Sequence, residues 1–186
     1  MTGSGDQQDA RARVRAARLR VMAFDVDGVL TDGSLFYTDD GIELKAFHTL
    51  DGHGLKMLQQ AGIVVAIITG RRARCVELRA HNLGIRHLYQ GVEDKLAVMT
   101  SLLAGLGVGA EAAGYMGDDV VDLPVMAACG FSAAPGDGHS LVQSHAALTT
   151  VRGGGRGAVR EVCEFILDAR GELEVALAPY LPAVER

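Results

Sequence analysis

The chain of 186 residues contains no tryptophan, only three cysteines and few aromatic residues. Its cysteines, Cys75, Cys129 and Cys163, are too widely spaced to form a zinc-type pair or the framework of a disulfide-rich secreted domain. The longest aliphatic run, residues 63–68, is too short to cross a membrane, and no signal-peptide segment follows the N-terminus. These absences predict a cytoplasmic protein that does not bind membranes.

The chain also lacks an excess of positive charge. Its net charge is −5, which gives no indication of binding to nucleic acid. Arginine is concentrated in the first twenty residues, at Arg11, Arg13, Arg15, Arg18 and Arg20. This segment could tether the chain to an anion, but a frayed tail followed by a solvated helix is the simpler interpretation.

Apolar runs typical of strands alternate with segments of helical periodicity. The strand-like runs cover residues 21–24, 62–68, 112–116 and 130–134, and the helical patterns cover residues 52–61, 72–83, 93–106, 120–128 and 157–169. This alternation predicts an α/β fold with a doubly wound, Rossmann-like parallel sheet. Continuous apolar runs agree, because the strands of such a sheet are buried on both faces. We expect one core domain over residues 20–171, an Arg-rich tail or helix over residues 1–19, and a C-terminal tail over residues 172–186.

One segment breaks this alternation. Residues 34–48 contain two short β-rich stretches around Asp39, Asp40 and Gly41. An Asp-Gly pair flanked by such stretches is a good hairpin signal. We therefore expect a β-hairpin inserted directly after the first strand.

Polar residues follow the predicted strands at their carboxyl ends. Asp25 and Asp27 follow the first strand, Thr69 ends the second, and Asp118 and Asp119 follow the third. The carboxyl edge of an open parallel sheet is where ligands bind, so these clusters can meet in one crevice. A lone Lys95 opens a later helical segment and can join them.

This set of side chains suits phosphoryl chemistry. Carboxylates without histidine or cysteine partners favour Mg²⁺, while a lysine and a hydroxyl suit a phosphoryl group. Side chains at positions i and i+2 of a strand point the same way, so Asp25 and Asp27 could reach one reaction centre. One carboxylate could attack phosphorus and the other could exchange protons with the leaving oxygen and with water.

The order of these motifs resembles that of the haloacid dehalogenase superfamily of phosphohydrolases. The resemblance extends over residues 20–170 and is closest to the cap-less subfamily that contains 3-deoxy-D-manno-octulosonate 8-phosphate phosphatase. It rests on DVDGVLTDG (25–33), the hairpin, IITGRRA (67–73), HLYQGVEDK (87–95), GDDVVDLPVM (117–126) and GGGRGAVREVCEFIL (153–167). It implies a haloacid dehalogenase fold without a cap domain and Mg²⁺-dependent hydrolysis of an acidic sugar phosphate in lipopolysaccharide sugar synthesis.

The resemblance also implies roles for individual residues. Asp25 matches the nucleophile that forms an aspartyl-phosphate, and Asp27 matches the general acid and base. Asp25, the backbone carbonyl of Asp27 and Asp118 match the Mg²⁺ ligands. Thr69 and Lys95 match the phosphate-binding residues. Asp119 and Asp122 match positions that support the metal site or hold the lysine.

Recognition of the sugar is implied for a further set of residues. Thr31, Asp32 and Gly33 match a substrate-side loop, and Gly70 and Arg71 lie in the second motif. His53 and Lys56 near the start of a helix could face the sugar, and Arg156 lies in a glycine-rich loop that could reach the site. Arg71 favours an octulosonate 8-phosphate, because a related nonulosonate 9-phosphate phosphatase typically has glutamate there. In the subfamily the hairpin builds a homotetramer in which a neighbouring subunit covers the active site, which makes Leu35, Phe36, Tyr37 and Phe47 candidate interface residues.

Other interpretations stay open at this point. A nonulosonate 9-phosphate or another small phosphate ester could be the substrate. A phospho-receiver module uses similar residues without being an enzyme, but it places its acidic pair before the phosphoacceptor, whereas Asp118 and Asp119 come last here. The glycines of residues 153–157 fit a weak dinucleotide fingerprint, but no βαβ unit follows them.

Overall fold

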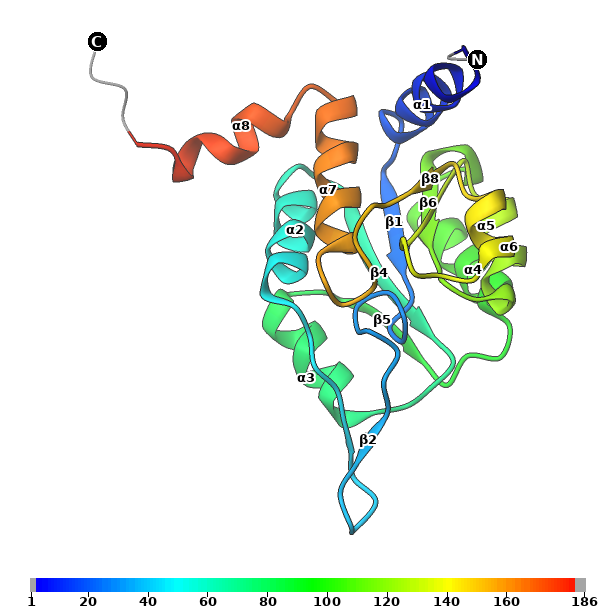
Figure 1. Cartoon of the computed structure of the whole chain (residues 1–186), viewed down its shortest axis with the longest axis vertical. Coiled ribbons are helices and arrows are strands. Elements are labelled where there is room, and N and C mark those ends of the chain that lie inside the picture. The colour runs from blue at the N-terminus through cyan, green and yellow to red at the C-terminus, as the bar shows by residue number, and fades with distance from the viewer. Residues whose placement is uncertain (1–2, 183–186) are drawn as a thin grey trace.

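The computed structural model describes residues 3–182, and its centre is a six-stranded parallel sheet (Figure 1). The strands are β1 (Val21–Phe24), β4 (Val64–Thr69), β5 (His87–Gln90), β6 (Ala113–Met116), β7 (Phe131–Ala134) and β8 (Leu148–Thr149). Their order across the sheet is β5-β4-β1-β6-β7-β8, so β1 is central. The predicted doubly wound α/β fold is confirmed, with β5 and the edge strand β8 as strands that the hydrophobic pattern did not predict.

Helices cover both faces of this sheet (Figure 1). One face packs against α1 (Gly3–Ala16), α2 (Thr49–Gln60), α3 (Arg74–Leu83) and α7 (Ala158–Ala169), and the other packs against α4 (Lys95–Leu106), α5 (Leu123–Ala128) and α6 (Ser140–His145). The central strand β1 serves both cores, since Met22 and Phe24 belong to the first and Val21 and Ala23 to the second. Burial of β1 on both faces fixes the position of the residues that follow it.

Helix α1 holds part of the Arg-rich segment against the domain. Ala12 and Ala16 are buried in the core that α1 shares with α7, while the five arginines stay exposed. Arg13 pairs with Asp168 of α7 and lies over the ring of Phe165. The segment is therefore a docked helix with a solvated outer face. Among residues 3–182, no helix combines the length and hydropathy needed to span a bilayer.

The inserted hairpin is present where it was predicted. Strands β2 (Phe36–Tyr37) and β3 (Glu43–Leu44) pair antiparallel, and Gly41 adopts a φ of 81° in the connecting turn. The hairpin projects away from the body of the domain (Figure 1). Its apolar side chains Leu35, Phe36, Tyr37, Ile42 and Leu44 are exposed. Phe47, in contrast, packs on the core of its own domain beneath the guanidinium of Arg79.

Beyond α7 the described residues form short helical segments. They are α8 (Leu173–Leu177) and the 3₁₀ turn η3 (Ala178–Tyr180), and η1 (Ala110–Ala112) and η2 (Val120–Asp122) are similar turns earlier in the chain. The ring of Tyr180 meets His53 of α2 edge to face. Residues 183–186 of the predicted C-terminal tail lie outside the described residues.

Candidate active site

The site begins at the carboxyl end of β1. Asp25 is buried, and its Oδ1 accepts a hydrogen bond of 2.7 Å from the backbone N–H of Val26. Gly28 then turns the chain with a φ of 79°, which favours glycine. A Cβ atom at this position would lie 2.0 Å from Oδ2 of Asp118, so glycine also leaves the room that this carboxylate occupies.

Distant segments meet the end of β1 around one cavity of about 390 Å³. Thr69 ends the neighbouring strand β4, Asp118 follows β6, and Lys95 is the first residue of α4. The residues that line the cavity are Asp25, Asp27, Gly28, Gly33, Thr69, Gly70, Arg71, Val92, Glu93, Lys95, Asp118, Asp119 and Val121. The structure therefore brings together every residue that the resemblance matched to the nucleophile, the proton donor, the phosphate binders or a metal carboxylate.

Lys95 lies between two carboxylates. Its Nζ donates to Oδ2 of Asp25 and to Oδ1 of Asp122, each at 2.6 Å. Burial alone would lower the pKa of the ammonium, but the charges of Asp25 and Asp122 outweigh it and raise the pKa. Lys95 therefore places an ammonium group directly beside the candidate nucleophile.

Asp122 is fully buried and uses both of its oxygens. Oδ1 accepts from Lys95 and, at 3.3 Å, from the hydroxyl of Tyr115. Oδ2 accepts from the backbone N–H groups of Asp118 and Asp119 at 3.2 and 3.4 Å. Asp119 in turn caps η2 through Val120. These contacts make Asp122 a support for the lysine and for the loop that carries Asp118.

Three carboxylates converge with too little positive charge to neutralise them. Asp25, Asp118 and Asp122 each place one oxygen within 4.8 Å of the others. Burial, followed by the charges of Asp25 and Asp122, raises the pKa of Asp118 to about 7. Burial and the charge of Asp122 also raise the pKa of Asp25 against the opposing effect of Lys95. An oxygen-only donor set of this kind fits a hard divalent cation such as Mg²⁺, which would offset the repulsion.

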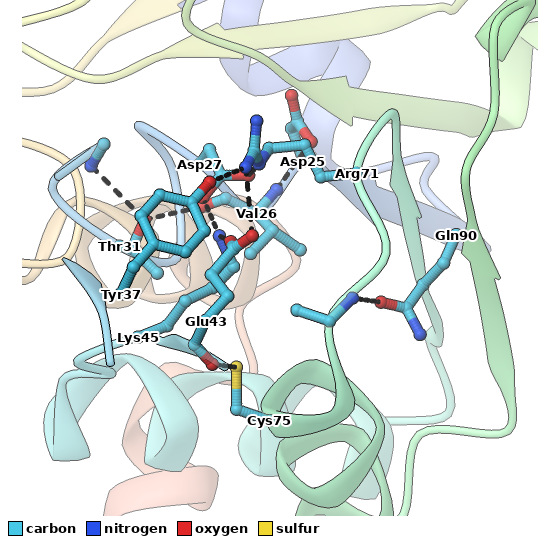
Figure 2. Close-up of polar contacts among 12 residues, drawn as sticks. Asp25, Val26, Asp27, Thr31, Tyr37, Glu43, Lys45, Arg71, Cys75 and Gln90 are labelled. Carbon is cyan, nitrogen blue, oxygen red and sulfur yellow. Dashed lines mark hydrogen bonds and ion pairs between the residues drawn. The ribbon is translucent and has the colours of Figure 1, made fainter. Parts of the chain in front are cut away.

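Asp27 faces a second network that comes from the hairpin (Figure 2). Lys45 donates to Oδ1 of Asp27 and also pairs with Glu43. Arg71 donates to Glu43 at 2.9 Å and to the hydroxyl of Tyr37 at 2.5 Å. Sequence reasoning assigned no role to Glu43 or Lys45. The only signal was their place in an insertion that directly follows the first motif, with Glu43 on its second strand and Lys45 just after that strand.

Only some of the predicted sugar-binding residues line the cavity. Gly33, Gly70 and Arg71 line the cavity. Thr31 is buried and its hydroxyl donates to the backbone carbonyl of Val26 at 3.3 Å, so it holds the first motif. Asp32 and Arg156 form an ion pair of 3.0 Å and are not among the lining residues.

His53 and Lys56 lie apart from the main cavity. They line a separate hollow of about 240 Å³ between α2 and α3, together with Arg79. The His53 ring also contacts Tyr180. Within one described chain these two residues do not meet the carboxylate cluster.

The glycine-rich loop of residues 153–157 packs on the first motif. The N–H of Gly155 donates to the carbonyl of Val29 at 2.9 Å, and a Cβ atom at Gly154 would lie 1.8 Å from the carbonyl oxygen of Gly28. The loop leads into α7, whose first N–H groups bind the buried carboxylate of Asp51. The glycines of residues 153–157 therefore allow close backbone packing. This packing accounts for the glycine-rich sequence, so no nucleotide-binding site is needed to explain it.

Comparison with known proteins gives a consistent result. No protein-family model matches the chain. The 3-deoxy-D-manno-octulosonate 8-phosphate phosphatase KdsC of Yersinia pestis is 51% identical over 162 residues, which cover 87% of each chain. The structure of the Moraxella catarrhalis enzyme of that name, in complex with a magnesium ion, a phosphate ion and a KDO molecule, is 40% identical. It matches with a TM-score of 0.89 over 91% of this chain and 98% of its own. A Legionella pneumophila structure assigned to subfamily IIIA of the HAD superfamily is also 40% identical, with a TM-score of 0.91 over 95% and 97% of the two chains.

Proposed function

Because the chain belongs to the family of 3-deoxy-D-manno-octulosonate 8-phosphate phosphatases, a cap-less branch of the haloacid dehalogenase superfamily, we propose that it hydrolyses this sugar phosphate. The products are the free sugar acid and inorganic phosphate, and the pathway is lipopolysaccharide sugar synthesis. The observation that carries the proposal is the convergence of Asp25, Asp27, Thr69, Lys95 and Asp118 on one cavity at the carboxyl edge of the sheet. The expected cytoplasmic location stays a prediction.

The first half of the reaction uses Asp25 as the nucleophile. A carboxylate oxygen of Asp25 attacks phosphorus, the bond between phosphorus and the sugar oxygen breaks, and Asp27 gives that oxygen a proton. Lys95 and Thr69 stabilise the charge that builds on the phosphoryl oxygens. The buried ion pair of Lys95 with Asp25 supports this assignment, because it puts a cation within 2.6 Å of the attacking group.

The second half returns the enzyme to its starting state. Water attacks the phosphorus of the aspartyl-phosphate, Asp27 takes a proton from that water, and the bond to Asp25 breaks to release phosphate. The same two carboxylates therefore serve both steps, with Asp27 first a proton donor and then an acceptor.

A divalent metal fits the carboxylates that are present. Asp25 and Asp118 would hold it with the backbone carbonyl of Asp27, and Asp122 would keep the Asp118 loop in place through its two amide contacts. The magnesium of the Moraxella relative supports Mg²⁺ as this metal. When bound, Mg²⁺ neutralises phosphoryl oxygens and lowers the repulsion that an anionic nucleophile meets.

Arg71 is our candidate for the sugar carboxylate. It lines the cavity, its side chain is 42% exposed, and it is held from below by Glu43 and Tyr37. A guanidinium recognises a carboxylate through two parallel hydrogen bonds. A substrate that carries a carboxylate as well as a phosphate would therefore bridge Arg71 and the Lys95 end of the cavity.

The hairpin is our candidate for assembly with further copies of this chain. Five apolar side chains project from it into solvent, and the described chain has no cap over the cavity. We propose a homotetramer in which hairpins pack together and a neighbouring subunit covers the site. The position of His53 and Lys56 outside the cavity leaves them available to a neighbour.

Phosphate release with Mg²⁺ tests the function. We expect strong preference for 3-deoxy-D-manno-octulosonate 8-phosphate over a nonulosonate 9-phosphate and over hexose phosphates. Asp25→Asn should abolish turnover while the far-ultraviolet circular dichroism spectrum stays that of the wild type. Substantial turnover by Asp25→Asn would overturn the nucleophile assignment, and equal turnover of the nonulosonate would overturn the substrate assignment.

A further inference from the structure

A lysine is buried at the base of the hairpin. The side chain of Lys45 is only 1% exposed, although the hairpin strands beside it are largely solvated. Burying an ammonium is unfavourable unless carboxylates compensate it, and an apolar residue would fill the same space at lower cost. Packing alone therefore does not explain a lysine at this position, and its partners indicate what it does.

Its partners are Asp27 and Glu43. Lys45 Nζ donates to Oδ1 of Asp27 and lies 2.5 Å from Oε1 of Glu43. Glu43 also accepts from Arg71 through its other oxygen, Oε2. Glu43 thus forms ion pairs with Lys45 through Oε1 and with Arg71 through Oε2, and only the contact with Arg71 has hydrogen-bond geometry.

The two oxygens of Asp27 differ in their hydrogen-bond contacts. Oδ1 is occupied by Lys45, whereas Oδ2 is buried and has no hydrogen-bond partner among the described residues. Nε of Arg71 lies 3.8 Å from Oδ2, beyond hydrogen-bond distance. Lys45 therefore fixes the carboxylate by one oxygen, while the other oxygen has no partner in a residue that lines the cavity.

We propose that Lys45 is a positioning residue for the proton transfer, which orients Asp27 so that Oδ2 gives its proton to the departing sugar oxygen. This inference rests on the proposed function, because it assumes that Asp27 is the general acid. In the step itself the Asp27 Oδ2–H bond breaks, the new O–H bond forms on the leaving oxygen, and the electrons of the broken P–O bond go to that oxygen. Lys45 loses and gains nothing in this step.

The way in which kcat/KM depends on the leaving group distinguishes a positioning role of Lys45 from a purely structural one. The value of kcat/KM includes only the steps up to departure of the leaving group. An alkoxide needs a proton to leave, and a positioned acid contributes roughly 10²- to 10⁴-fold to such a step. A 4-nitrophenolate leaves without one. Benzyl phosphate and 4-nitrophenyl phosphate make this comparison without a carboxylate that Arg71 or Lys45 could bind.

The test measures kcat/KM for both esters with Mg²⁺ in the wild type, Lys45→Met and Asp27→Asn. We expect Lys45→Met to lower the value for benzyl phosphate at least tenfold more than the value for 4-nitrophenyl phosphate. Equal losses on both esters would overturn the proposal, because loss of the fold or of assembly acts on every substrate alike. In the Asp27→Asn background, Lys45→Met should change the ratio of the two values no further.

Controls keep the outcome interpretable. Arg74→Met removes an exposed cation from α3 beside the hairpin and should leave the ratio unchanged. Lys45→Gln keeps a shorter hydrogen-bond donor and gives the same comparison should Lys45→Met fail to fold, with a smaller change of the same sign. A wild type without activity on any phosphate ester would overturn the proposed function itself. If the wild type is active but Asp27→Asn lowers kcat/KM equally for both esters, Asp27 is not the general acid. The proposed role of Lys45 is then overturned as well, while the proposed function stands.

Discussion

Lys95 and Asp122 form an ion pair of 2.6 Å from which solvent is almost wholly excluded. Asp122 also accepts from the backbone of the Asp118 loop, so one carboxylate sets the position of the proposed phosphate-binding cation and of a candidate metal ligand. The buried side chain of Asp122 therefore positions both Lys95 and the Asp118 loop in the proposed reaction centre. We expect its loss to affect both stability and catalysis.

Loss of the Asp122 charge should destabilise the fold. Asp122→Asn leaves the buried Lys95 with Asp25 as its remaining carboxylate partner, and a hydrogen bond to a charged group typically contributes about 1.5–3 kcal/mol. We expect the free energy of unfolding in urea to fall by about that amount and phosphate release to fall with it. Asp168→Asn, which breaks a surface pair with Arg13, is the matched control and should change stability by less than about 1 kcal/mol. Similar losses for both variants would contradict the prediction.

The raised pKa of Asp118 predicts how the metal-free protein responds to pH. A carboxyl group with a pKa of about 7 in the folded state, above its ordinary value, binds more protons when folded than when unfolded. Its contribution to stability is therefore lost as pH rises from about 4 to about 7. With EDTA present, Asp118→Asn should have a higher Tm than the wild type at pH 8, and this difference in Tm should be much smaller at pH 5.

Metal binding should reverse this order. Saturating Mg²⁺ should raise the Tm of the wild type at pH 8, because binding to the folded state alone stabilises it, and should leave Asp118→Asn almost unchanged. An equal response of both proteins to Mg²⁺ would show that Asp118 is not a ligand.

Asp51 should stabilise the start of α7. Its buried carboxylate accepts from the backbone N–H groups of Gly157 and Arg160 at 3.3 and 2.9 Å, and Gly157 has no side chain with which to cap the helix. Asp51→Ala leaves these N–H groups unpaired and should lower the free energy of unfolding by about 1–3 kcal/mol. Urea unfolding measures the loss, and Asp51→Asn, which keeps an acceptor oxygen, should recover part of it. No difference between the two variants would argue against a capping role.

The exposed hairpin predicts the oligomeric state. Phe36 is 53% exposed and lies among other apolar side chains of the hairpin, so Phe36→Asp should convert the proposed tetramer to monomers. Size-exclusion chromatography with light scattering measures the mass directly. Leu78→Asp introduces the same charge at a side chain of α3 that is 52% exposed, and it should leave the tetramer intact. A wild type that elutes as a monomer would refute the assembly proposal.

Much of the fold and the site could be predicted from the sequence because both follow a local rule. Apolar runs marked the buried strands, and the residues after them had to lie at one edge of a parallel sheet. Asp25, Thr69 and Asp118 meet for this reason alone. The hairpin was predictable from its Asp-Gly turn, where Gly41 takes the positive φ that such a turn requires.

The contacts that could not be predicted depend on side-chain packing between distant segments. The pairing of Lys45 with Asp27 needs the segment that follows the hairpin to return beside the first motif, and no periodicity encodes that path. Asp51 resembles an ordinary residue in the first turn of α2, yet it caps a helix that starts more than 100 positions later. The edge strand β8 has only two residues, too few to give a hydrophobic pattern.

The central place of β1 has a consequence for synthesis on the ribosome. β1 is made first but lies between β4 and β6, so its two edges are paired only after both later strands have emerged. A nascent chain of 110 residues already carries Asp25, Thr69 and Lys95, but neither Asp118 nor Asp122. In that chain β1 has one open edge and Lys95 lacks one of its two carboxylates. The proposed reaction centre therefore forms only after residue 122 has been made, although Asp25, its proposed nucleophile, precedes most of the domain.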